Sequence, residues 1–175
     1  MRLELDYNKL RGMAKARQMV REQALYRSMD EVFEFFSNAE NLGRITPDFM
    51  NFKIVTPLPI EMKQGAIIDY KIRLYGVPMK WKTHIAEWKW GSHFVDEQQK
   101  GPFALWHHLH AFEERDGVVW MKDTVNYRAP LGPLGGLAHV AMVDRTVKKI
   151  FDHRFKIVED LLGPRNIPTT DGLKT

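Results

Sequence analysis

Apolar and polar residues alternate in two neighbouring segments of the chain. In residues 66–76, every second side chain is apolar or aromatic, namely Ile68, Tyr70, Ile72 and Leu74. In residues 79–85, the same spacing selects Met79, Trp81, Thr83 and Ile85. A period of two places each set on one face of a β-strand. Such strands are typical of an antiparallel sheet that is covered on one face only.

Gly76-Val77 predicts how these two strands pair. With glycine first, the dipeptide is typical of a two-residue type II′ hairpin loop. This loop sets Leu74 opposite Met79, Ile72 opposite Trp81, Tyr70 opposite Thr83 and Ile68 opposite Ile85. Every pair joins residues of the apolar face, whereas a slip of one residue would break that agreement.

A second hairpin is predicted at Asp116-Gly117, a strong type I′ signal. Pairing outward from it sets His110 opposite Asp123 and Trp106 opposite Tyr127. The strand before the turn, in LWHHLHAF, then presents the row Trp106, His108, His110 and Phe112 to the covered side. We expect His107 to lie on the outer surface, with His84, His93 and His153. The outer face of the second strand, Trp120 to Arg128, reads as mostly solvated.

The remaining segments complete the order of elements. Residues 18–25 alternate like a strand, and Ser28 with Glu31 forms a capping box for a helix that packs Val32, Phe33, Phe35 and Phe36. A short helix follows from Asn38 to about Pro47. Residues 52–57 and 93–101 read as strands. The second of these points either Phe94, Asp96 and Gln98 or Val95, Glu97 and Gln99 inward. Residues 138–162 have the 3.6-residue periodicity of a long helix.

This order of elements predicts an α+β fold. A strongly bent antiparallel sheet of about seven strands wraps around one long C-terminal helix, and two short helices follow the first strand. We expect a single domain over residues 1–175, with its core at about 18–162. Residues 163–175 are polar and broken by Gly and Pro, which predicts a flexible tail. The pattern leaves open the role of residues 1–15.

Composition narrows the classes of function. The net charge is +4, but basic and acidic residues are interspersed, so we expect no nucleic-acid partner. No apolar run approaches the roughly 20 residues of a membrane span. The N-terminus lacks a secretory pattern and Cys is absent, so we expect a cytoplasmic protein. No phosphate loop, dinucleotide glycine pattern or nucleophile elbow occurs.

Four stretches carry a resemblance to a known family: SMDEVFEFFSNAENLGRITP (28–47), YGVPMKW (75–81), FVDEQQKGPFALWHHLHAFEE (94–114) and YRAPLGPLGGLAH (127–139). With the order of elements, they resemble the START-like, or SRPBCC, superfamily, and most of all its bacterial cyclase/dehydrase-like and coenzyme Q-binding-like members. The birch pollen allergens and the polyketide aromatase/cyclases share its helix-grip fold.

The resemblance implies an elongated cavity between the sheet and the long helix. Its expected lining is Ile68, Tyr70, Ile72, Trp81, Trp106, His108, His110, Asp123 and Tyr127. Leu134 would lie at the rim, in a Gly/Pro-rich loop with Leu131 and Leu137. These leucines can be interpreted as a gate, as a loop that touches a membrane or as packing under the helix, so membrane contact stays open. The oligomeric state also stays open.

We therefore expect the chain to bind a hydrophobic or aromatic small molecule, such as a lipid, an isoprenoid or a polyketide-like compound. The alternative is an aromatase/cyclase- or dehydratase-type enzyme in which His108 or His110 moves protons and Asp123 tunes them. A third interpretation is an interaction module with a vestigial cavity. The His110–Asp123 pair itself reads either as an oriented imidazole for a ligand or as a buried polar pair that satisfies itself.

A metal site is the remaining interpretation of the histidines. His108 and His110 lie about 7 Å apart along a strand. With Asp96 or Asp123 they have the composition of a two-histidine, one-carboxylate site. His-x-His is common by chance, however, and the resemblance implies no metal. We expect no metal and no other cofactor.

Overall fold

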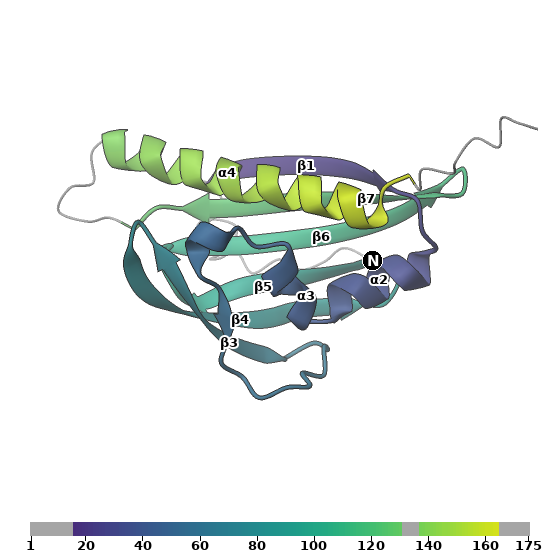
Figure 1. Ribbon diagram of the computed structural model, residues 1–175, viewed down its shortest axis with the longest axis horizontal. Coiled ribbons are helices and arrows are strands. Elements are labelled where there is room, and N and C mark those ends of the chain that lie inside the picture. The colour runs from purple at the N-terminus through teal and green to yellow at the C-terminus, as the bar shows by residue number, and fades with distance from the viewer. Residues whose placement is uncertain (1–15, 131–136, 165–175) are drawn as a thin grey trace, which may run out of the picture.

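The computed structural model describes residues 16–130 and 137–164 (Figure 1). The strands are β1 (Arg17–Leu25), β2 (Lys53–Ile54), β3 (Ile67–Leu74), β4 (Val77–Lys89), β5 (His93–Lys100), β6 (Leu105–Arg115) and β7 (Val118–Arg128). The helical elements are α2 (Met29–Ser37), α3 (Glu40–Arg44), the 3-10 turn η1 (Asp48–Met50) and α4 (Leu137–Leu162). The strands form one antiparallel sheet in the order β1-β7-β6-β5-β4-β3-β2.

The helices cover one face of this sheet (Figure 1). The long helix α4 runs along the half of the sheet formed by β1, β7 and β6, and α2 and α3 lie over the other strands. This arrangement is the predicted helix-grip fold. The inward side chains of β3 to β7 face the interior between the sheet, α4 and the short helices.

Local sequence explains how α2 begins and closes one end of the grip. The Ser28 hydroxyl accepts a hydrogen bond from the Glu31 amide, and the Glu31 carboxylate accepts one from the Ser28 amide, so the predicted capping box forms. Val32 and Phe33 are fully buried against Phe112 and the last turns of α4. This apolar cluster anchors the C-terminal end of α4.

The β6–β7 hairpin has the predicted turn and register. Asp116 and Gly117 both have positive φ, 52° and 75°, as a type I′ turn requires. His110 lies opposite Asp123, and Trp106 lies opposite Tyr127. The even-numbered row of β6 is buried on the concave face, where His108 and His110 are each 2% exposed.

The β3–β4 hairpin corrects one prediction. Its turn is Tyr75-Gly76 rather than Gly76-Val77, because both Tyr75 and Gly76 adopt positive φ. Tyr70 therefore pairs with Trp81 rather than Thr83, and Leu74 pairs with Val77. The shift moves each partner by two residues, so every side chain keeps its face. The alternation predicted the face correctly, whereas the turn signal misplaced the loop.

Three further differences concern strands and burial. The strand expected at 52–57 has only two residues, Lys53–Ile54, although Val55 still donates a backbone hydrogen bond to Asp69. The surface position expected for His107 is wrong, because this residue is only 8% exposed. On the same outer face, Asn126 is buried and accepts a hydrogen bond from Gln18 of β1. Edge strand β1 thus shelters part of a face that alternation alone predicts to be solvated.

Some predictions concern residues outside the described ranges. These are Leu131 and Leu134 of the Gly/Pro-rich loop, the tail from residue 165 onward and the N-terminal residues 1–15. Within the ranges that are described, no helix is both long enough and apolar enough to cross a membrane.

Replacing Gly117 with Ala tests the hairpin that aligns His110 with Asp123. Gly117→Ala places a Cβ at φ 75°, so we expect a loss of about 1 kcal/mol in the free energy of unfolding. The control is Gly43→Ala inside helix α3, where the new Cβ meets Phe52 at an ordinary 3.6 Å and should not destabilise. Urea denaturation measures both. Equal effects of the two substitutions would contradict the role of the turn.

Candidate functional site

Two adjoining hollows lie between the concave sheet face and the helices. The first has a volume of about 100 Å³ and lies under α4, and the second has about 60 Å³ and lies toward α2 and α3. Asp96, Tyr70 and Arg154 line both, so these residues mark the boundary between the hollows.

Most of the expected cavity residues line these hollows. The first includes Tyr70, Ile72, Trp81, Trp106 and His108, and the second includes Ile68, Tyr70 and His110. Asp123 lines neither of the two and lies behind the histidines. Tyr127 also lines neither; it packs near Trp106 and donates a hydrogen bond to Asp144. Leu134 belongs to the residues that are not described.

Aromatic side chains form the walls of the first hollow. The Trp81 and Trp106 rings meet edge to face with centroids 5.3 Å apart, and Phe103 lies 4.7 Å from Trp106. The polar atoms of this wall are already satisfied: the Trp81 indole donates to the Thr83 hydroxyl at 3.1 Å, and the Tyr70 hydroxyl bonds the same oxygen. The surface offered to an occupant is therefore mainly apolar.

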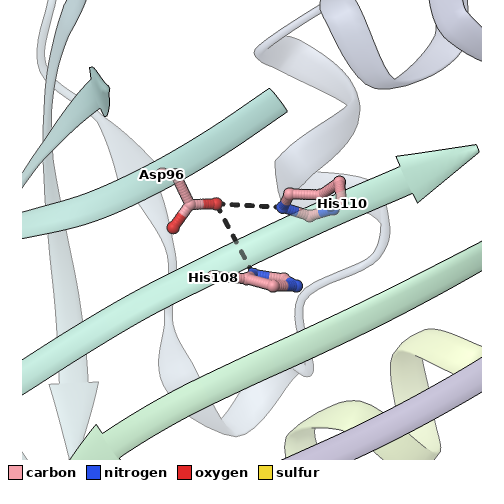
Figure 2. A group of neighbouring side chains, drawn as sticks. All are labelled: Asp96, His108 and His110. Carbon is pink, nitrogen blue, oxygen red and sulfur yellow. Dashed lines mark hydrogen bonds and ion pairs between the residues drawn. The ribbon is translucent and has the colours of Figure 1, made fainter. Parts of the chain in front are cut away.

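A polar cluster interrupts this apolar lining (Figure 2). Asp96 of β5 points its carboxylate at two imidazoles of β6. Its Oδ2 atom lies 3.0 Å from His110 Nε2 and 3.5 Å from His108 Nδ1. The Trp106 indole donates to the other oxygen, Oδ1, at 3.3 Å. The inward register of β5, left open by the sequence, is thus Phe94 and Asp96, and the Phe94 ring stacks on His110 with centroids 4.1 Å apart.

Asp123 lies on the other side of the same imidazoles. Its Oδ1 atom is 2.9 Å from His108 Nε2 and 2.9 Å from His110 Nδ1. From helix α4, Arg154 brings its Nε to 4.0 Å from Asp123 Oδ2 and its Nη2 to 3.4 Å from His110 Nδ1. Each imidazole therefore lies between two carboxylates. Asp123 contacts both histidines rather than His110 alone.

The shared burial shifts the protonation of these groups. Burial, with the neighbouring His110, lowers the pKa of His108 to about 4, so this imidazole is neutral at pH 7. Burial alone would raise the pKa of Asp123, but Arg154 and the two histidines outweigh it and hold that pKa well below its usual range. For Asp96, burial again opposes ionisation, and His108 and His110 bring the pKa below its ordinary value. Both carboxylates are thus charged.

Arg154 is the main residue that the sequence analysis missed. It lies seven residues after Val147 and four before Val158, on the buried stripe of α4, so helical periodicity alone could have placed it inside. An arginine on such a stripe signals a buried acidic partner. Phe103 was missed for another reason. It follows Gly101-Pro102 in an irregular segment where no periodicity fixes its direction.

A third, open depression of about 570 Å³ lies on the outer face of the sheet, around Val95, Leu109 and Trp120. It is larger, but none of the clustered residues Asp96, His108, His110, Asp123 and Arg154 lines it. The buried acid–imidazole chemistry belongs to the concave side, so the candidate site is there.

Comparison with known proteins supports the fold. No protein-family model and no curated protein matches the chain. Among solved structures, the Zhui aromatase/cyclase from Streptomyces sp. R1128 matches with a TM-score of 0.67 and 13% identity, over 83% of this chain and 93% of that one. The protein TTHA0849 from Thermus thermophilus matches with a TM-score of 0.66 and 13% identity, over 82% of this chain and 95% of that one.

A plant protein has the same architecture. The ginseng major latex-like protein 151 from Panax ginseng matches with a TM-score of 0.59 and 11% identity, over 85% of this chain and 99% of that one. These similarities confirm the helix-grip fold that the sequence resemblance implies. The class defined by fold and site is a helix-grip protein with a small aromatic cavity and a buried acid–imidazole cluster.

Substitution of Asp123 tests whether the cluster is sheltered. Asp123→Asn removes a charge that is 3% exposed and leaves Arg154 without a partner carboxylate, so we expect a loss of about 3–5 kcal/mol in the free energy of unfolding. The control is Asp152→Asn, in an exposed pair with Lys148 and Arg21, which should cost no more than about 1 kcal/mol. Chemical denaturation at pH 7 compares them. Equal losses would mean that Asp123 is solvated.

Proposed function

We propose that the protein binds a small hydrophobic or aromatic molecule in the hollow between the sheet and α4. The observation that carries this proposal is the aromatic wall of Trp81, Trp106 and Phe103 beside a compact polar cluster. An apolar pocket with a few oriented polar groups is the usual form of a small-molecule site. Burial of roughly 200 Å² of ligand surface would supply about 5 kcal/mol before the costs of association.

The volume of the hollow favours a compact ligand. Ligand pockets commonly measure roughly 300–1,000 Å³, whereas the first hollow has about 100 Å³. An apolar cavity of about 150 Å³ holds benzene, so the two adjoining hollows of about 100 and 60 Å³ match one aromatic ring, and a two-ring molecule requires the lining side chains to move apart. Either molecule suits this space better than an extended lipid or isoprenoid chain. The Phe103 side chain is the one we expect to move, because it is only partly buried, whereas Gln98 holds the Phe103 backbone N–H and C=O.

The polar cluster gives such a ligand an orientation. Asp96 and the imidazole of His108 border the first hollow. A phenol or enol hydroxyl would donate a hydrogen bond to the carboxylate while its ring packs on Trp106. A buried hydrogen bond to a charged group contributes about 1.5–3 kcal/mol. The proposed ligand class is therefore a hydroxylated aromatic or polyketide-like compound.

The test uses 1-naphthol as a neutral bicyclic probe, together with native mass spectrometry of freshly purified protein. Ile72→Phe narrows the first hollow and should weaken 1-naphthol binding at least tenfold, measured by quenching of tryptophan fluorescence. Val55→Phe, at a residue 52% exposed, is the matched control and should bind like the wild type. The absence of both saturable binding and a retained small molecule would refute the proposal.

A second candidate function is catalysis of the aromatase/cyclase or dehydratase type. One observation favours it: two imidazoles in contact with two carboxylates border the hollows, an arrangement that can take up and release protons. A structural neighbour named as an aromatase/cyclase adds support from fold alone. In this interpretation His108 or His110 moves protons at the substrate.

His110→Gln separates the two functions. In an enzyme, this change should lower turnover by about 100-fold or more, while the affinity for the bound molecule changes little. In a carrier, only the affinity changes. The measurement follows, by mass, conversion of the molecule recovered from the purified protein. Lack of conversion by the wild type would eliminate the catalytic candidate. His153→Gln, on the partly exposed side of α4, is the control.

A further inference from the structure

We propose that Asp96, His108 and His110 bind a divalent transition-metal ion at the boundary between the two hollows. This inference adds a metal to the site of the proposed function, but it does not depend on the identity of the apolar ligand. It also revises the expectation of no metal. The sequence could not show which carboxylate accompanies the histidines, or from which side.

The geometry of the three side chains fits one ion. Asp96, His108 and His110 each offer one ligand atom, and these atoms all lie within 4.8 Å of one another (Figure 2). The carboxylate oxygen Oδ2 lies 3.0 Å from His110 Nε2 and 3.5 Å from His108 Nδ1. Ligands at 2.0–2.2 Å from an ion are separated from one another by roughly 3.0–3.5 Å. The two carboxylate–imidazole separations already lie in this range, and the two imidazole nitrogens lie within 4.8 Å of each other.

The donor and acceptor atoms of the two imidazoles explain why a cation suits this position. A neutral imidazole has one N–H and one lone pair, yet each of these imidazoles faces a carboxylate at both nitrogens. When His108 donates from Nε2 to Asp123 at 2.9 Å, its Nδ1 lone pair faces Asp96 Oδ2 at 3.5 Å. Two electron-rich atoms then meet in a buried space, and a cation between them would bind both.

The distribution of charge points to the same side. The guanidinium of Arg154 lies toward Asp123 and so compensates the carboxylate behind the histidines. Over residues 16–130 and 137–164, Asp96 interacts with the two imidazoles and the Trp106 indole but forms no ion pair with a lysine or arginine. Asp96 thus has no cationic side chain in direct contact, although the charge of Arg154, which lines both hollows beside it, acts on it at longer range.

The surroundings supply the second layer that metal sites need. Asp123 contacts the imidazole nitrogens opposite the donor atoms, which fixes the orientation of the two rings. Trp106 holds Asp96 Oδ1 and so aims Oδ2 at the histidines. Two imidazoles and one carboxylate favour ions such as Fe²⁺, Co²⁺ or Zn²⁺ over Ca²⁺ or Mg²⁺. Three protein ligands leave further coordination positions, which face the hollows.

The experiment titrates Co²⁺ into chelator-stripped wild-type protein and follows its visible absorption and the melting temperature. We expect saturation at one ion per chain and a higher melting temperature. Asp96→Asn and His110→Gln should each weaken Co²⁺ binding at least 100-fold, and Asp123→Asn should weaken it about 10- to 100-fold. Asp152→Asn, an exposed acid on α4, is the matched control and should bind like the wild type.

A wild-type measurement covers the case in which a variant does not fold. Zn²⁺, which is diamagnetic, should shift the imidazole NMR signals of His108 and His110 while those of His153 stay in place. The proposal is overturned if the wild type shows no equimolar binding of Co²⁺ or Zn²⁺, or if folded Asp96→Asn and His110→Gln variants bind like the wild type. Binding of 1-naphthol by metal-free protein, without metal binding, would overturn this inference alone. Metal binding without 1-naphthol binding would overturn only the proposed function.

Discussion

The contact of Asp123 with two imidazoles and an arginine is the constraint on which the rest of the structure depends. It joins β7, β6 and α4 at the centre of the grip, where the three charged or polar partners are nearly inaccessible to water. Removal of any partner would leave a buried polar group uncompensated. The apolar clusters on either side could be filled by many combinations of side chains, but this contact requires these residues at these positions.

The fold was predictable because it follows from short-range rules. Alternation assigned the inward face of β3, β4, β6 and β7 correctly, and Asp116-Gly117 fixed the register that brings His110 opposite Asp123. The β3–β4 loop was misplaced because the positive φ of Tyr75 is unusual for a non-glycine residue. A turn signal based on glycine alone therefore shifted the loop by one residue.

The site was only partly predictable, because some of its side chains come from elements whose position relative to β6 and β7 cannot be derived from strand pairing. The direction of Asp96 could not be fixed, because either alternating set of side chains in its strand could face inward. Arg154 lies on a helix, 44 residues after His110 in the sequence. Pairing rules relate neighbouring strands, but they say nothing about which helical residue reaches across to a sheet. The sequence thus identified the imidazoles and both candidate acids, whereas the three-dimensional packing settled the inward direction of Asp96 and supplied the guanidinium.

The insertion of Arg154 between α4 and the sheet also limits how the molecule can move. A displacement of α4 by one helical turn, about 5.4 Å, would carry the guanidinium away from Asp123. Both charges would then be buried without a partner. This contact therefore holds α4 in its position against the sheet. The 101–104 segment, which connects β5 to β6, belongs to no strand, but the Gln98 side chain bonds the Phe103 N–H and C=O, and the Ala104 N–H donates to the Arg128 carbonyl.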